Sequence, residues 1–86
     1  MSKKYEFYWL AKLLVNCKFK LTSKDKLVAS YLILPKEDCG ARRYSAVAIS
    51  ELSGLALRTV HKSVGRLEAI GAISFLTDNH YALEDI

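Results

Sequence analysis

The sequence predicts a small, mainly α-helical fold that ends in a β-hairpin, which places the chain in the α+β class. Apolar residues recur every three or four positions through residues 57–67, the spacing of one buried helix face. Gly54 and Gly71 bracket that segment, and glycine adopts the left-handed conformation that ends helices at little steric cost. Residues 72–76 and 80–84 flank a short polar turn, as the two strands of a hairpin do.

An N-terminal helix is expected over residues 5–16, and it is apolar over most of its circumference. Such a helix needs more than one partner surface. One side is expected to pack on the domain, and the other to meet a second copy of the chain. The alternative is that its aromatic side chains only cover the edge of the core. The residues expected at the subunit contact are Phe7, Trp9, Leu10 and Leu13.

A second helix is expected over residues 23–34. Thr22 and Asp25 resemble a capping box at its start, and Pro35 stops it because proline cannot continue a helix. Residues 35–44 are polar and predict a loop, and Tyr44 and Ser45 are expected to form a short first strand and the cap of the next helix.

Two helices joined by a tight turn are expected over residues 46–70, the second of them over residues 57–70. This second helix has one apolar face and one basic, polar face. An apolar face backed by a basic face suits a helix that is anchored to a core and lies in a DNA groove.

Three short motifs in this region belong together. Gly54-Leu55 forms the turn, Thr59-Val60 stands near the start of the second helix, and a Leu-Glu-x-x-Gly-x-Ile sequence covers residues 67–73. In these features the chain resembles the winged helix-turn-helix family of small plasmid, phage and bacterial regulators. The resemblance implies a single winged helix domain over residues 1–86 with an extra N-terminal helix, and a wing over residues 72–84. It also implies binding of double-stranded DNA.

Two features depart from the family pattern. Ala56 stands where the recognition helix usually has a Ser or Thr N-cap. The wing carries no Lys or Arg, although many wings hold phosphate with a basic residue. The wing residues left to contact DNA are Thr77, Asn79 and His80.

The outward face of the recognition helix carries the residues expected to read DNA. Arg58 is the strongest candidate because its planar fork matches O6 and N7 of guanine. The alternative is an ordinary solvated helix face. The residues expected at base edges are Arg58, His61 and Lys62. Those expected at the DNA backbone are Thr59, Ser63, Arg66, Arg42 and Arg43.

The charge of the chain is unevenly distributed. The net charge is +4, but residues 1–66 hold all 13 Lys and Arg with five acids, and residues 67–86 hold four acids and no base. A localised positive field attracts phosphate and speeds association with DNA.

The sequence gives little support to a metal site, a catalytic site or a membrane-spanning segment. Cys17 and Cys39 are not at metal-ligand spacing from each other or from the two histidines, so no metal or cofactor is expected. No catalytic pattern stands out, and the chain is not expected to be an enzyme. The apolar N-terminal run is too short to cross a bilayer, so a cytoplasmic, nucleoid-associated protein is expected.

The sequence therefore predicts sequence-specific DNA binding, with transcriptional regulation as a homodimer. Two alternatives stay open. A winged helix can serve as a protein-contact module, which the acidic wing and apolar N-terminal helix favour, or it can be the DNA-binding domain of a plasmid or phage replication initiator.

Overall fold

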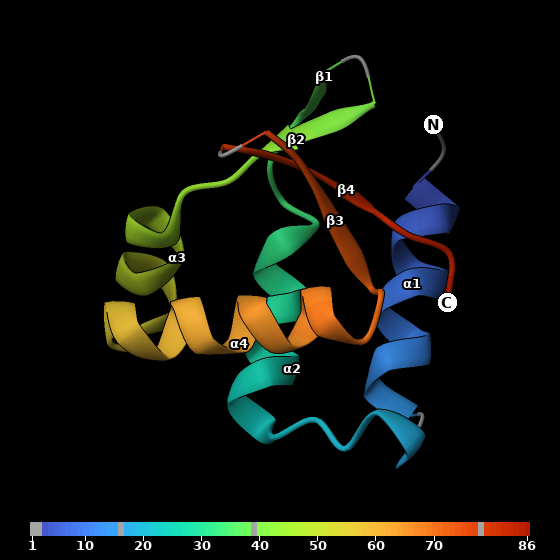
Figure 1. Ribbon diagram of the computed structural model, residues 1–86, viewed down its shortest axis with the longest axis horizontal. Coiled ribbons are helices and arrows are strands. Elements are labelled where there is room, and N and C mark those ends of the chain that lie inside the picture. Colours follow the sequence, from blue (N-terminus) through green and yellow to red (C-terminus); the bar gives the residue numbers. More distant parts are fainter. Residues whose placement is uncertain (1–2, 16, 39, 78) are drawn as a thin grey trace.

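The computed structural model describes residues 3–15, 17–38, 40–77 and 79–86, and in these residues the chain forms four α-helices and a four-stranded antiparallel sheet. The predicted α+β class is therefore confirmed. The helices are α1 (Lys3–Val15), α2 (Ser23–Leu32), α3 (Ala46–Ser53) and α4 (Leu57–Ala69), with a short 3-10 turn, η1 (Cys17–Phe19), after α1 (Figure 1). The first helix begins two residues before its predicted start, and Asn16 lies outside the described residues.

Local caps explain where α2 begins and ends. The backbone N–H of Asp25 donates to Thr22 Oγ1 over 3.1 Å, and the backbone N–H of Thr22 donates to Asp25 Oδ2 over 3.1 Å. The predicted capping box is therefore present. The helix ends at Leu32, two residues before its predicted end, because Pro35 disfavours helical geometry in the residue that precedes it.

The tight turn between α3 and α4 is held by serines of α3. Gly54 takes a left-handed conformation with φ of 78°, as predicted for this position. Ser53 Oγ accepts the backbone N–H of Leu55, and Ser50 Oγ donates to the carbonyl of Leu55. Helix α4 itself begins after Ala56, which makes no side-chain cap. The turn is thus fixed from the α3 side.

The sheet is larger than the predicted hairpin. Strands β3 (Ile73–Thr77) and β4 (His80–Leu83) form that hairpin, and the sheet order is β1-β2-β4-β3. The expected polar loop over residues 35–44 instead contains strands β1 (Glu37–Asp38) and β2 (Ala41–Arg43). Strand β2 pairs with β4 through the partners Arg42 and Tyr81. The prediction of a loop here was wrong because β2 is stabilised by pairing with a strand far along the chain.

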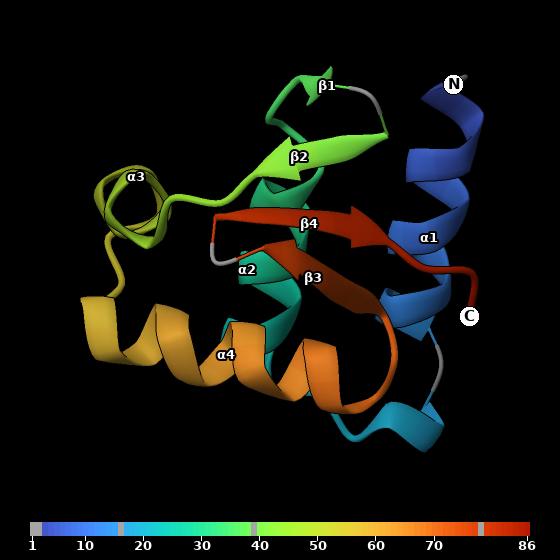
Figure 2. The same ribbon diagram turned by 45° about the horizontal axis from the view of Figure 1, so that its top comes forward.

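The core lies where α1, α2 and α4 pack against one face of the sheet (Figure 2). Two hydrogen bonds cross it. Trp9 Nε1 donates to the carbonyl of Ala72 over 2.7 Å, and the Tyr81 hydroxyl donates to the carbonyl of Leu32 over 2.5 Å. The largest buried apolar side chains are Trp9, Leu13, Val28, Leu32, Val60, Leu67, Ile73 and Tyr81.

This core corrects the predicted role of two N-terminal residues. Trp9 is 2% exposed and Leu13 is fully buried inside the chain. Neither side chain is accessible to a second copy, so their predicted place at a subunit contact was wrong. Of the other two residues expected there, Leu10 is half-buried against the core and Phe7 is exposed.

Candidate nucleic-acid interface

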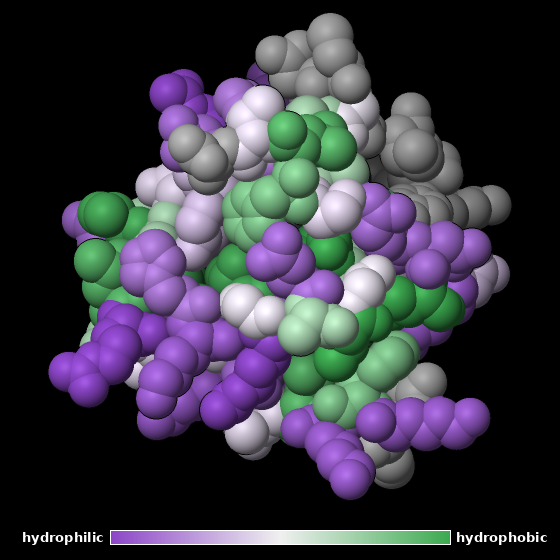
Figure 3. Space-filling view, viewed as in Figure 1, coloured by the Kyte–Doolittle hydropathy of each residue, from purple (hydrophilic) through white to green (hydrophobic). Residues whose placement is uncertain are grey.

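The outward face of α4 is polar and basic, as its sequence predicts. The helix buries Val60, Val64 and Leu67 against the core and leaves Arg58 and Lys62 exposed. Neither Arg58 nor Lys62 forms a hydrogen bond or ion pair through its side chain with any described residue. Both charges therefore stay available to a ligand. In Figure 3 a hydrophilic surface covers this part of the molecule, at the lower left.

His61 is exposed on the same face and is held from one side. Its Nδ1 lies 3.3 Å from the Tyr44 hydroxyl. The Tyr44 ring packs edge-on against Phe75 and Tyr81 of the sheet, with ring centroids 5.4 and 6.3 Å apart. Burial raises the pKa of the Tyr44 hydroxyl, which stays a neutral hydrogen-bonding group at pH 7. His61 is thus positioned by an aromatic row that joins α4 to the sheet.

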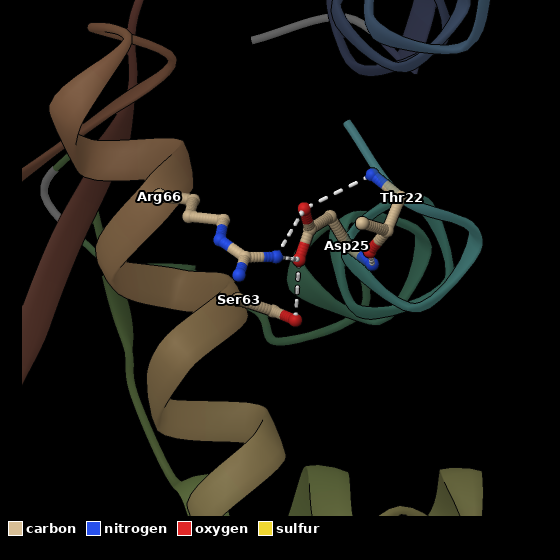
Figure 4. Close-up of polar contacts among 4 residues, drawn as sticks. All are labelled: Thr22, Asp25, Ser63 and Arg66. Atoms are coloured by element: carbon tan, nitrogen blue, oxygen red, sulfur yellow. Dashed lines mark hydrogen bonds and ion pairs between the residues drawn. The ribbon is translucent and has the colours of Figure 1, made fainter. Parts of the chain in front are cut away.

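A buried carboxylate ties α4 to α2 (Figure 4). Asp25 is fully buried and accepts a hydrogen bond from Ser63 Oγ over 2.7 Å. Arg66 Nη1 lies 3.2 Å from Asp25 Oδ2, and the Arg66 side chain remains 54% exposed. Burial raises the pKa of Asp25, but the hydrogen bonds from Ser63, the Thr22 backbone and Arg66 outweigh it and hold the pKa below its ordinary value.

These contacts change the roles of two predicted backbone-binding residues. Ser63 is 2% exposed and donates to Asp25, so its predicted contact with the DNA backbone was wrong. The charge of Arg66 is already paired with Asp25, although part of its guanidinium faces solvent. The exposed part of the Arg66 guanidinium can approach a phosphate while the ion pair with Asp25 is kept.

A shallow cleft of about 460 Å³ runs between α4 and the start of α2. The exposed Lys24 lies on its α2 side, and the half-buried Thr59 and exposed Lys62 lie on its α4 side. The cleft therefore brings two lysines and a hydroxyl together beside the outward face of α4. The contribution of Lys24 could not be predicted from sequence, because the packing of α2 on α4 decides which α2 residues border that face.

The two arginines before α3 have opposite environments. Arg42 is 3% exposed, pairs with Glu6 at 2.7 Å, and donates to the carbonyls of Ile33 and Pro35. Its predicted contact with DNA was therefore wrong, since its guanidinium is used inside the fold. Arg43 is exposed on β2 and remains available.

The wing turn presents small polar groups. Thr77 and Asn79 are exposed, and His80 is half-buried. Thr77 Oγ1 lies 3.2 Å from His80 Nδ1 and accepts the backbone N–H of Asn79 over 3.4 Å. The Thr77 hydroxyl therefore already stabilises the turn, and Asn79 is the most accessible side chain of the three.

No family model, curated protein or solved structure matches the chain. The chemistry of the site is therefore inferred from its own residues. Within the described residues, no three His, Cys, Asp or Glu side chains gather as metal ligands would. None of the described helices is long and apolar enough to span a bilayer.

Proposed function

We propose that the chain is a winged helix-turn-helix protein that binds double-stranded DNA through α4 and acts as a transcriptional regulator. The supporting observation is the pair of unpaired cations, Arg58 and Lys62, on the outward face of a helix whose other face is anchored in the core. A helix held in this way can enter the major groove without disturbing the fold.

The surroundings of α4 suit a duplex in that position. Arg58, the second residue of α4, is placed to contact a base edge, since the first residues of a recognition helix reach deepest into the groove. Lys24 and Lys62 border the adjoining cleft and would neutralise phosphates. Tyr44 holds Nδ1 of His61, which leaves Nε2 of the exposed ring to face a ligand.

The test is fluorescence anisotropy of a labelled random-sequence duplex over a range of salt concentrations. With about five or six phosphates neutralised, the slope of log K against log salt is expected near −4 to −6. The Arg58→Ala/Lys62→Ala variant should bind more weakly and lower the magnitude of the slope by about one, because the phosphate contact of Lys62 is lost.

The matched control is Lys20→Ala/Lys36→Ala. It removes two positive charges from exposed positions outside α4, and neither lysine forms an ion pair within the described residues. If both double variants lose affinity equally, the attraction is a property of net charge and α4 is not the binding element. If the parent does not bind duplex even at low salt, DNA binding is contradicted.

A second candidate function, contact with another protein, is favoured by one specific observation. An apolar cavity of about 250 Å³ lies between α2, α3 and the end of β2, with Tyr31, Ile49 and Tyr44 among its lining residues. Leu34 and Leu52 at its edge are 62% and 65% exposed. A chain that acts only through this cavity is expected not to bind duplex DNA at physiological salt. The same anisotropy series therefore separates the two functions.

A further inference from the structure

The outer side of α1 carries an apolar surface that no described part of the chain covers. Two of its residues are aromatic and two are aliphatic, with a small residue between them. Phe7, Tyr8, Leu14 and Val15 are 65%, 67%, 43% and 77% exposed, and Ala11 is exposed as well. These positions share one side of the helix because each of the four large residues lies three or four residues from Ala11. We call the surface formed by these five residues the α1 face.

Two charged groups of α1, beside the α1 face, are paired within the chain. Glu6 lies 2.7 Å from Arg42, and Lys12 lies 3.2 Å from Asp85. In Figure 3 apolar side chains are visible at the right of the molecule, over α1. The character of the α1 face suits an apolar partner and differs from the basic surface of α4.

We infer that the α1 face is the contact between two copies of this chain, with the two α1 helices antiparallel and Ala11 on the twofold axis. The spacing of the exposed residues about Ala11 is symmetric. Phe7 and Val15 lie four residues on either side of it, and Tyr8 and Leu14 lie three residues on either side. An antiparallel pair therefore sets Phe7 against Val15 of the second copy and Tyr8 against its Leu14.

This symmetry is what a twofold contact requires, because each residue must meet a residue that suits it on an identical surface. The small side chain of Ala11 lets the two helices approach closely where they cross. Each large aromatic residue then packs on an aliphatic one, so the two copies interlock without an unfilled gap at the axis.

The area of the α1 face agrees with a weak dimer. With about 150–250 Å² for a whole aromatic side chain, the exposed parts of the five residues sum to roughly 450 Å² per copy. Two copies would bury roughly 900 Å² from these side chains, just below the range of about 1,200–2,000 Å² of stable specific interfaces and within the range of weak ones.

The position of α1 also suits the proposed function, on which this one argument rests. Helix α1 lies at one end of the longest axis of the molecule, which measures 30 Å (Figure 1). Two copies joined at that end have centres about 30 Å apart. Half-sites on one face of DNA are about 34–36 Å apart. A twofold axis along the line of sight of Figure 1 keeps α4 of both copies in front of α2, on the same side of the dimer.

The first test is sedimentation velocity of the whole chain without DNA, from low to high micromolar concentration. We expect a monomer–dimer equilibrium. Ala11→Glu places two like charges together on the axis and should raise the dissociation constant by at least about tenfold. Leu52→Ser is the matched control, since Leu52 on α3 is 65% exposed, as Phe7 is. It should leave the equilibrium unchanged, and circular dichroism checks that both variants fold.

The second test locates the axis. In a Cys17→Ser/Cys39→Ser background, Ala11→Cys should form a disulfide-linked dimer on mild oxidation, because the residue on a twofold axis faces its own copy. Leu52→Cys in the same background should not.

A chain that stays monomeric at high micromolar concentration overturns the inference, and so does a dimer that Leu52→Ser weakens while Ala11→Glu does not. Neither measurement involves DNA. A monomer that still binds duplex DNA through α4 would contradict the dimer and leave the proposed function intact. A dimer that does not bind duplex DNA would support the dimer and contradict the proposed function.

Discussion

At the scale of single residues, Asp25 supports most of the polar contact between α2 and α4. It closes the capping box of α2, accepts the hydroxyl of Ser63, and pairs with Arg66. A carboxylate that is fully buried would be costly without such partners. In the described residues, no buried side-chain nitrogen or oxygen lacks a hydrogen-bond partner, which is consistent with its retention as the charged form.

Replacing Asp25 should therefore lower stability and remove part of its pH dependence. Asp25→Asn should cost about 1–3 kcal/mol at pH 7, measured by urea unfolding, because it weakens a buried hydrogen-bonded group. The pKa of Asp25 is lowered in the folded state, so its stabilisation is present above the unfolded pKa of about 3.9 and is lost as the pH falls below it.

The parent chain should thus lose stability below about pH 4 more steeply than Asp25→Asn does. Asp85→Asn is the control, since Asp85 is 84% exposed and its pair with Lys12 should contribute little. Equal acid sensitivity of the parent and Asp25→Asn would show that other carboxylates carry the effect.

Trp9 was predicted at a subunit contact and instead lies in the core. The apolar pattern of the N-terminal helix suggested a contact with a second copy, but Trp9 is buried and donates to Ala72. Trp9→Ala should destabilise the fold by about 3–5 kcal/mol in urea unfolding, as large-to-small core changes do. Phe7→Ala, on the exposed side of the same helix, should change the unfolding free energy of the monomer by less than about 1 kcal/mol. A small effect of Trp9→Ala would place the indole outside the core.

At the scale of elements, the start of α4 is the least stabilised helix end in the candidate site. Ala56 has extended backbone geometry with φ of −63° and ψ of 147°, which fits an N-cap, but it has no oxygen to accept a backbone N–H. By contrast, Ser45 Oγ accepts the backbone N–H of Ala48 at the start of α3.

Supplying that oxygen should stabilise the chain. Ala56→Ser should raise the free energy of unfolding by about 1 kcal/mol, measured by thermal or urea denaturation. Ala56→Asp should stabilise the isolated chain at least as well through the helix dipole, yet weaken binding to duplex by placing a negative charge near the phosphates. If Ala56→Asp binds duplex as tightly as Ala56→Ser, the start of α4 does not face DNA.

The helices were predictable because their ends carry local signals. Thr22, Gly54 and Gly71 mark boundaries that depend only on nearby backbone geometry, and Gly71 has a φ of 82°. The added strands β1 and β2 carry no such signal. Strand β2 pairs with β4, which lies about forty residues further along the chain, and β1 pairs with β2. Only the folded chain brings β2 and β4 together.

At the scale of the whole molecule, charge alone did not identify which basic residues face outward. Arg42 and Arg43 are neighbours in sequence, but one is buried with Glu6 and the other is exposed. In the same way, Ser63 is buried and Lys62 beside it is exposed. The basic face of α4 was predictable from helical spacing, whereas the roles of Arg42, Ser63 and Lys24 depend on which elements pack together.

The hydrogen bond from Trp9 to Ala72 has a further consequence. It ties α1 to the short link that leaves α4, and both helices also pack in the same core. A dimer built on the α1 face would then have no flexible linker between its two α4 helices. Each base pair inserted between the half-sites advances one of them by about 3.4 Å and rotates it by about 34–36°. A rigid dimer cannot rotate one α4 helix relative to the other to match that change. Binding would therefore depend on the number of base pairs between the two half-sites as well as on the bases within each half-site.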